Sequence, residues 1–196
     1  MKVALIDYGA GNLRSVANAL RALGQEPAVV ADAAELGDAT HLLLPGVGSF
    51  GDCMAQLEQR GLANLIRSWV SAGRPYLGIC LGYQILFDSS DESPGVAGLG
   101  LFRGKVKRFG DVPGVKIPHM GWNAARPAKP NLKNWAGLGD APYFYFVHSY
   151  FPVPEDESIV ASRTDYAAEN FASSIESGAV LACQFHPEKS QDAGLR

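Results

Sequence analysis

The sequence contains few cysteines, no long hydrophobic run and no basic run. Its three cysteines, Cys53, Cys80 and Cys183, are far apart and lack C-x-x-C spacing, which argues against a disulfide framework or a structural zinc site. A reducing, cytoplasmic location fits best. The apolar run Val3–Ile6 stops at Asp7, too short for a signal peptide, and nothing approaches a membrane span. The net charge of −3 makes nucleic acid an unexpected partner.

What the sequence does contain is enough apolar material, 47% of 196 residues, for one domain spanning residues 1–196. Short apolar runs first alternate with helical patterns, as in a parallel sheet, and later follow one another as strands. The expected strands are Lys2–Ile6, Ala28–Val30, His41–Leu44, Tyr76–Ile79, Leu101–Phe109, Tyr143–Val147, Ser158–Ser162, Asn170–Ile175 and Ala179–Gln184. The last two are expected to form a hairpin. The prediction is an α/β fold with an open, mostly parallel sheet, an antiparallel extension and helices on both faces.

Cys80 is the strongest candidate for a reactive residue. It lies between the expected strand Tyr76–Ile79 and an expected helix, Leu81–Phe87, and glycines flank it as Gly78-x-Cys80-x-Gly82. This spacing resembles a nucleophile elbow, in which a tight strand-to-helix turn exposes a reactive side chain. The helix N-terminus favours a thiolate, and the Leu81 N–H can stabilise an oxyanion. A lone cysteine is more often a buried hydrophobe, but this context favours the nucleophile.

Two glycine-containing loops follow earlier strands. The first, ending at Asn12 as the expected N-cap of a helix over Leu13–Leu23, only partly matches a dinucleotide-binding fingerprint, because Arg14 replaces its third glycine. A tight turn is the preferred interpretation. The second, Pro45–Phe50, leaves the carboxyl end of its strand, where open α/β sheets bind ligands. Glycines on both sides of Val47 allow its amide to point toward or away from such a site.

A base for Cys80 is found near the C-terminus. The last strand leads into His186-Pro187-Glu188, and residues two apart in an extended segment point the same way. Glu188 can therefore orient one nitrogen of His186 and leave the other to take the thiol proton, as in a Cys-His-acid triad. His148, at another strand end, is a competing base without a carboxylate two residues on.

The segment Ile117–Asn123 has little periodicity and is expected to lie outside the core. Its methionine and tryptophan, Met120 and Trp122, are of the kind that serve protein contacts. For His119, an interface role and a hydrogen-bonded loop position are both open.

Three motifs together resemble the class I glutamine amidotransferase family: Pro45–Gly48, Gly78–Gln84 and Phe185–Glu188. More narrowly, further segments resemble the glutaminase subunits of imidazole glycerol phosphate synthase. These segments are Asp7–Ser15, Pro118–Asn123, Val147–Tyr150 and Pro187–Ser190. The resemblance covers nearly the whole chain and implies a flavodoxin-like fold. The family also continues past the positions of Gly194–Arg196 to finish a closing helix.

The resemblance implies roles for individual residues. Cys80 would be the nucleophile, His186 the general base and acid, and Glu188 its orienting partner, with the amides of Val47 and Leu81 as the oxyanion hole. Substrate glutamine would be held by Gly48, Gln84, His148, Ser149 and Tyr150. Asn12, His119, Met120 and Trp122 are the expected interface residues. No metal or cofactor is expected.

The resemblance also implies a partner. Glutamine would be hydrolysed to glutamate and ammonia, and the ammonia would pass to a cyclase subunit, a (β/α)8 barrel, in a heterodimer. That subunit makes imidazole glycerol phosphate and an aminoimidazole carboxamide ribotide in histidine synthesis. Two alternatives remain open: a glutaminase serving a different synthase, and a non-catalytic subunit that keeps the fold as a scaffold.

Overall fold

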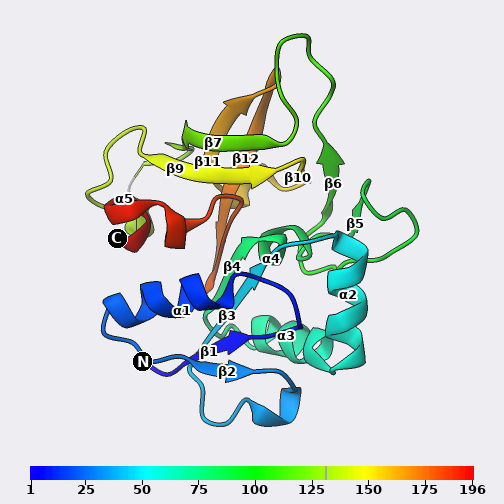
Figure 1. Cartoon of the computed structure of the whole chain (residues 1–196), viewed down its shortest axis with the longest axis vertical. Helices are drawn as coiled ribbons and strands as arrows, with labels where there is room; N and C mark the ends of the chain where they lie inside the picture. Colours follow the sequence, from blue (N-terminus) through cyan, green and yellow to red (C-terminus); the bar gives the residue numbers. More distant parts are fainter. Residues whose placement is uncertain (131) are drawn as a thin grey trace.

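The computed structural model describes residues 1–130 and 132–196. Strands and helices alternate up to Gln84, and strands dominate afterwards (Figure 1). The first part comprises β1 (Val3–Ile6), α1 (Leu13–Ala22), β2 (Ala28–Val30), β3 (His41–Gly46), α2 (Phe50–Gln59), α3 (Leu62–Ser71), β4 (Tyr76–Cys80) and α4 (Leu81–Gln84). The second comprises β5 (Ser89–Ser90), β6 (Gly104–Arg108), β7 (His119–Ala124), β8 (Arg126–Pro127), β9 (Tyr143–His148), β10 (Tyr150–Pro154), β11 (Val160–Tyr166), β12 (Glu169–Ser177), β13 (Val180–Cys183) and α5 (Gln191–Leu195).

Within the described residues, the main sheet has eight strands in the order β2-β1-β3-β4-β13-β12-β11-β8. The pairs from β2 to β13 are parallel, and those from β13 to β8 are antiparallel. This confirms the expected parallel sheet with its antiparallel extension. The connection reverses direction between β1 and β3, so the carboxyl edge there is the position at which open α/β sheets bind ligands.

Helices cover both faces of the parallel part, as expected. Successive strand residues point to opposite faces, and β1 contributes Ala4 and Ile6 to one hydrophobic core and Val3 and Leu5 to the other. Helices α2 and α3 pack on the first core and α1 on the second, so they lie on opposite sides of the central strands (Figure 1). Buried on both faces, these strands are fixed in position, and so are the loops at their ends.

Strands β5, β8 and β10 were not expected from the sequence, and the expected strands Leu101–Phe109 and Ser158–Ser162 are observed as β6 and β11. Three further differences concern segments to which the sequence analysis gave a role. The helix after Cys80 ends at Gln84, and Ile85–Phe87 continue as turns. Asn12 precedes α1, but its side chain makes no capping hydrogen bond among the described residues. The segment predicted to lie outside the core contains β7, which pairs antiparallel with β9 and places His119 opposite His148. Buried and exposed residues roughly alternate along β7, but one of the buried residues is the polar His119, so the sequence does not show the apolar alternation expected of a strand.

None of the described helices has the length and apolar character needed to span a bilayer.

Candidate active site

Cys80 occupies a strained turn between β4 and α4. Its φ of 55° and ψ of −105° lie in a region that residues with a side chain rarely adopt. The flanking glycines are needed because the turn is tight: a Cβ on Gly82 would lie 2.0 Å from the Leu44 carbonyl oxygen, and one on Gly78 would lie 2.4 Å from the Gly82 oxygen. The elbow predicted from the spacing is therefore present, with backbone packed on both sides.

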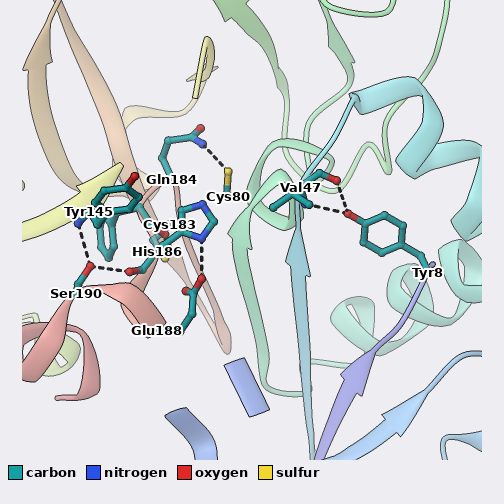
Figure 2. A network of polar contacts seen from close by, with 10 residues as sticks. Tyr8, Val47, Cys80, Tyr145, Cys183, Gln184, His186, Glu188 and Ser190 are labelled. Atoms are coloured by element: carbon teal, nitrogen blue, oxygen red, sulfur yellow. Dashed lines mark hydrogen bonds and ion pairs between the residues drawn. The ribbon is translucent and has the colours of Figure 1, made fainter. Parts of the chain in front are cut away.

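His186 and Glu188 form a buried pair. His186 Nδ1 lies 2.8 Å from Glu188 Oε1, and each side chain is 2% exposed. Figure 2 shows the imidazole between Glu188 and Cys80. A further contact fixes the backbone, because Ser190 Oγ donates to the His186 carbonyl at 2.6 Å and accepts from the Tyr145 N–H at 2.9 Å. The His186 ring is thus fixed by Glu188, and its backbone is connected through Ser190 to strand β9.

The charge state of His186 follows from its neighbours. Burial would lower its pKa, but interactions with the Cys80 and Glu188 side chains outweigh burial and raise the pKa from 6.5 to about 9. Its Nε2 is buried without a hydrogen-bond partner among the described residues. A ring whose pKa is raised by two acidic neighbours is suited to give a proton to a leaving group.

His148 is differently placed. Its Nδ1 lies 2.8 Å from the Tyr150 carbonyl oxygen, which can only accept, so Nδ1 carries the proton and Nε2 is an acceptor. His119 Nδ1, 3.1 Å from that Nε2, must then be the donor. Burial lowers the pKa of His148 to about 3 and that of His119 to about 4. Both rings are neutral at pH 7, and the acceptor nitrogen of His148 is already occupied.

The Val47 amide is engaged by Tyr8. The Val47 N–H donates to the Tyr8 hydroxyl at 3.1 Å, and the same hydroxyl donates to the Val47 carbonyl at 3.0 Å (Figure 2). Burial raises the pKa of Tyr8, so the hydroxyl is neutral and serves both contacts. In this conformation the Val47 N–H is therefore not available to an oxyanion.

A cavity of about 310 Å³ adjoins Cys80 and gathers residues from five segments of the chain. Its walls include both expected oxyanion residues and all five expected substrate residues: Val47, Leu81, Gly48, Gln84, His148, Ser149 and Tyr150. Glu92 also lines it, and its carboxylate accepts from the Phe50 N–H at 2.7 Å. Residues that are far apart in the sequence thus line one cavity at the carboxyl edge of the sheet.

The expected interface residues fall into two groups. Met120 and Trp122 on β7 are 63% and 46% exposed, and Tyr143 on the paired β9 is 60% exposed. His119 is 3% exposed, with its ring stacked between Phe146 and Tyr166. Of the two interpretations left open for His119, the structure therefore favours the hydrogen-bonded position over the interface role, although the residue lies on strand β7 and not in a loop.

The sequence reasoning missed four polar residues at the site: Tyr8, Glu92, Gln184 and Ser190. Each makes its contact through the fold, and Tyr8 reaches a residue 39 positions away. The signals nearest to them were the segments Asp7–Ser15 and Pro187–Ser190, which contain Tyr8 and Ser190, and the Phe185–Glu188 motif, which Gln184 directly precedes.

A family model described as Glutamine amidotransferase class-I matches residues 4–194. The chain belongs to the class-I glutamine amidotransferase family. Two relatives that share half of its sequence are more specific.

Imidazole glycerol phosphate synthase subunit HisH of Aquifex aeolicus is 50% identical over 197 residues, covering 100% of this chain and 93% of that protein. The subunit of the same name from Methanothermobacter thermautotrophicus is 50% identical over 193 residues, covering 98% and 93%. A solved structure titled as a glutamine amidotransferase matches with a TM-score of 0.76 at 23% identity, covering 100% and 95%, and supports the fold alone.

Proposed function

We propose that residues 1–196 form one glutaminase domain, the glutaminase subunit of an imidazole glycerol phosphate synthase. It hydrolyses L-glutamine to glutamate and ammonia through a thioester on Cys80. The observation that carries this proposal is the buried His186–Glu188 pair beside a cysteine whose elbow opens onto the cavity.

In the proposed reaction, Cys80 Sγ attacks the carboxamide carbon of glutamine. The carbonyl oxygen becomes an oxyanion. The C–N bond then breaks as His186, which holds the proton taken from the Cys80 thiol, gives it to the leaving nitrogen to form ammonia. His186 next removes a proton from a water molecule, which attacks the thioester carbon and releases glutamate and the Cys80 sulfur. Glu188 keeps His186 in the orientation that leaves Nε2 for these transfers.

The competing base, His148, is disfavoured by its surroundings. Its pKa of about 3 and its contact with His119 leave no free basic nitrogen near neutral pH. We propose instead that His148 helps to bind the substrate in the cavity, together with Gly48, Gln84, Ser149 and Tyr150.

Glu92 is a further proposed substrate contact. It brings a carboxylate to the cavity wall, and glutamine carries an α-ammonium group that a carboxylate can bind.

The oxyanion hole is proposed to have one fixed and one movable donor. The Leu81 N–H follows Cys80 in the packed elbow. The Val47 N–H must leave the Tyr8 hydroxyl before it can reach the oxyanion. Removing one oxyanion donor costs about 10²–10³ in rate, so the conformation described here is a low-activity form.

The proposed partner is a cyclase subunit, a (β/α)8 barrel that takes up the ammonia in a heterodimer. The two relatives named above are subunits of such a synthase, which supports a partner. We place the contact at Met120 and Trp122, the exposed residues of β7, and at Asn12 in the loop after β1. A partner that binds the turned form of the Val47 peptide more tightly would activate the glutaminase.

The two alternatives make different predictions. A scaffold without activity would have no need of the strained Cys80 and the buried acid–histidine pair. A glutaminase of a different synthase would not rescue histidine synthesis.

The test is to measure glutamate release by the purified chain with and without a cyclase subunit, and to ask whether the gene rescues a histidine auxotroph lacking its own glutaminase subunit. Glutamate release with rescue supports the proposal. Glutamate release without rescue indicates another synthase, and the absence of release in both conditions rejects the enzyme.

A further inference from the structure

Gln184 contacts the sulfur of the nucleophile. It follows β13, two residues before His186, and is fully buried. Its Nε2 lies 3.5 Å from Cys80 Sγ (Figure 2), within the distance of a hydrogen bond to sulfur. A buried glutamine beside a strand is ordinarily a core residue whose amide is satisfied by the backbone, so the side-chain partners of Gln184 decide whether it does more.

Those partners fix which end of the amide faces the sulfur. Gln84 Nε2 lies 2.9 Å from the Tyr150 carbonyl oxygen and 3.0 Å from Gln184 Oε1. A backbone carbonyl only accepts, so the Gln84 atom is an NH₂ group, and the Gln184 atom that meets it must be the oxygen. The NH₂ group of Gln184 is thereby directed at Cys80.

The backbone of Gln184 is also fixed. Its N–H donates to the Ser173 carbonyl at 2.9 Å on the neighbouring strand β12. The side chain therefore starts from a rigid position, and the amide is held at one end by Gln84 and at the other by the sulfur.

We propose that Gln184 is a further catalytic residue, a hydrogen-bond donor to the Cys80 thiolate that acts alongside His186. A donor on sulfur stabilises the thiolate relative to the thiol, because the charged form is the better acceptor. The arrangement also joins a proposed substrate residue to the nucleophile, since Gln84 lines the cavity and contacts Gln184. This inference rests on the proposed glutaminase function for its kinetic part only.

The test replaces Gln184 with Met, which has a similar length but no donor. The probe is iodoacetamide, which alkylates thiolates, and the measurement is the rate of alkylation of Cys80 from pH 5 to pH 10. We expect the midpoint of the profile to rise by about one pH unit, a tenfold loss of thiolate at lower pH, as one hydrogen bond to a charged group is removed. Glutamine turnover should fall at least about tenfold in kcat with a smaller change in KM.

The matched control is Ser174→Ala, which removes another buried polar group. Among the described residues, the only side chain that hydrogen-bonds to Ser174 Oγ is that of Ser162. It should leave the alkylation midpoint unchanged. Cys53 and Cys183 are buried and, unlike Cys80, do not line the cavity, so their protection from alkylation reports that each variant is folded.

If Q184M fails that check, Gln184→Glu serves in its place. Its protonated acid can donate to sulfur and its carboxylate cannot, so alkylation should be slowed most above the pKa of the new acid. An unchanged midpoint in the folded variant overturns the proposal. Failure of the wild-type chain to hydrolyse glutamine would reject the glutaminase function, whereas the alkylation profile still decides the role of Gln184.

Discussion

The elbow around Cys80 and the loop after β3 lie side by side, yet they are held in opposite ways. Gly46, the last residue of β3 before that loop, is the register partner of Cys80 in the sheet. In the elbow, a Cβ on Gly82 would meet the Leu44 backbone at 2.0 Å. Gly48 has a φ of 103°, and a Cβ there would have no atom of the described residues within 4 Å. The neighbouring Val47 is 39% exposed.

This contrast assigns different tasks to two glycines that look alike in the sequence. Gly46 is required by close packing, because its Cβ would lie 2.6 Å from the Leu81 Cβ. Gly48 is required by its positive φ alone. The loop is therefore packed against the elbow at Gly46, and beyond it the hydroxyl of Tyr8 holds the N–H and the carbonyl of Val47.

The largest expected effect comes from removing the reactive sulfur of the elbow while keeping the backbone of the turn. Cys80→Ala should abolish glutamine hydrolysis, since no other described thiol lines the cavity. Partner binding and cyclisation driven by added ammonia should persist in the complex. The measurement is glutamate release by the purified variant, and release at the wild-type rate would refute the assignment of the nucleophile.

Changes in the His186–Glu188 pair should be graded. His186→Asn should be nearly as damaging as losing the cysteine, with a loss of about 10⁴-fold or more, because triad members act as a unit. Glu188→Gln should cost roughly a hundredfold less than His186→Asn, since Glu188 contributes mainly orientation. Single-turnover rates with glutamine measure both. Wild-type rates for His186→Asn would return the role of base to His148.

The glycines sharpen the comparison between the two loops. Gly82→Ala should destabilise the fold by about 1–3 kcal/mol, because its Cβ must displace backbone. Gly48→Ala has space and strains only the loop, so it should change the ratio of partner-stimulated to basal turnover with a smaller loss of stability. Urea unfolding and glutamine turnover of both variants make the test. Equal destabilisation would mean that the loop is as rigid as the elbow.

The titration of His186 is a smaller, spectroscopic test. Its ring should titrate near pH 9 in the wild type and at a lower pH in Cys80→Ala, where one of the acidic neighbours is gone. Because the pKa of His186 is higher in the folded chain than its ordinary value of 6.5, protonation of this ring stabilises the fold. The contribution is complete below pH 6.5 and is lost as the pH rises through about 9. NMR of the imidazole protons gives the midpoint, and a value near 6.5 in the wild type would contradict the buried charged ring.

The smallest expected effect concerns Tyr8. Tyr8→Phe removes the hydroxyl that holds the Val47 peptide and should raise basal turnover by up to about tenfold, a part of what one oxyanion donor is worth. The control is Tyr83→Phe, which removes another buried hydroxyl, bonded to the Ala172 carbonyl at 3.2 Å. Turnover that falls in Tyr8→Phe would show that the hydroxyl supports the active form instead.

The sequence predicted the elements whose signals are local. The spacing of Gly78, Cys80 and Gly82 located the elbow. The hydrogen bond between His186 and Glu188 was also predicted, although Pro187–Lys189 form a 3-10 helix and not the extended segment from which the bond was inferred. Strand β7 was missed because a buried histidine and a glycine at φ of 136° obscure its alternation.

Other features depend on residues that only the fold brings together. Tyr8 and Val47 come from different βα units, and Gln184 meets a cysteine 104 positions away. Such contacts depend on strand order and register, which a single sequence does not give. The same is true of Glu92, whose loop reaches the cavity from beyond α4.

In the proposed enzyme, one oxyanion donor is fixed and the other is released by the partner. The most direct measurement compares glutamine turnover of the lone chain, of its complex with the cyclase subunit, and of that complex with the cyclase ligand bound. We expect slow turnover in the lone chain and a rise of about 10²–10³ in the liganded complex, as the Val47 N–H becomes available. A lone chain that already runs at the rate of the liganded complex would contradict the claim and leave the loop glycines a turn-forming role only.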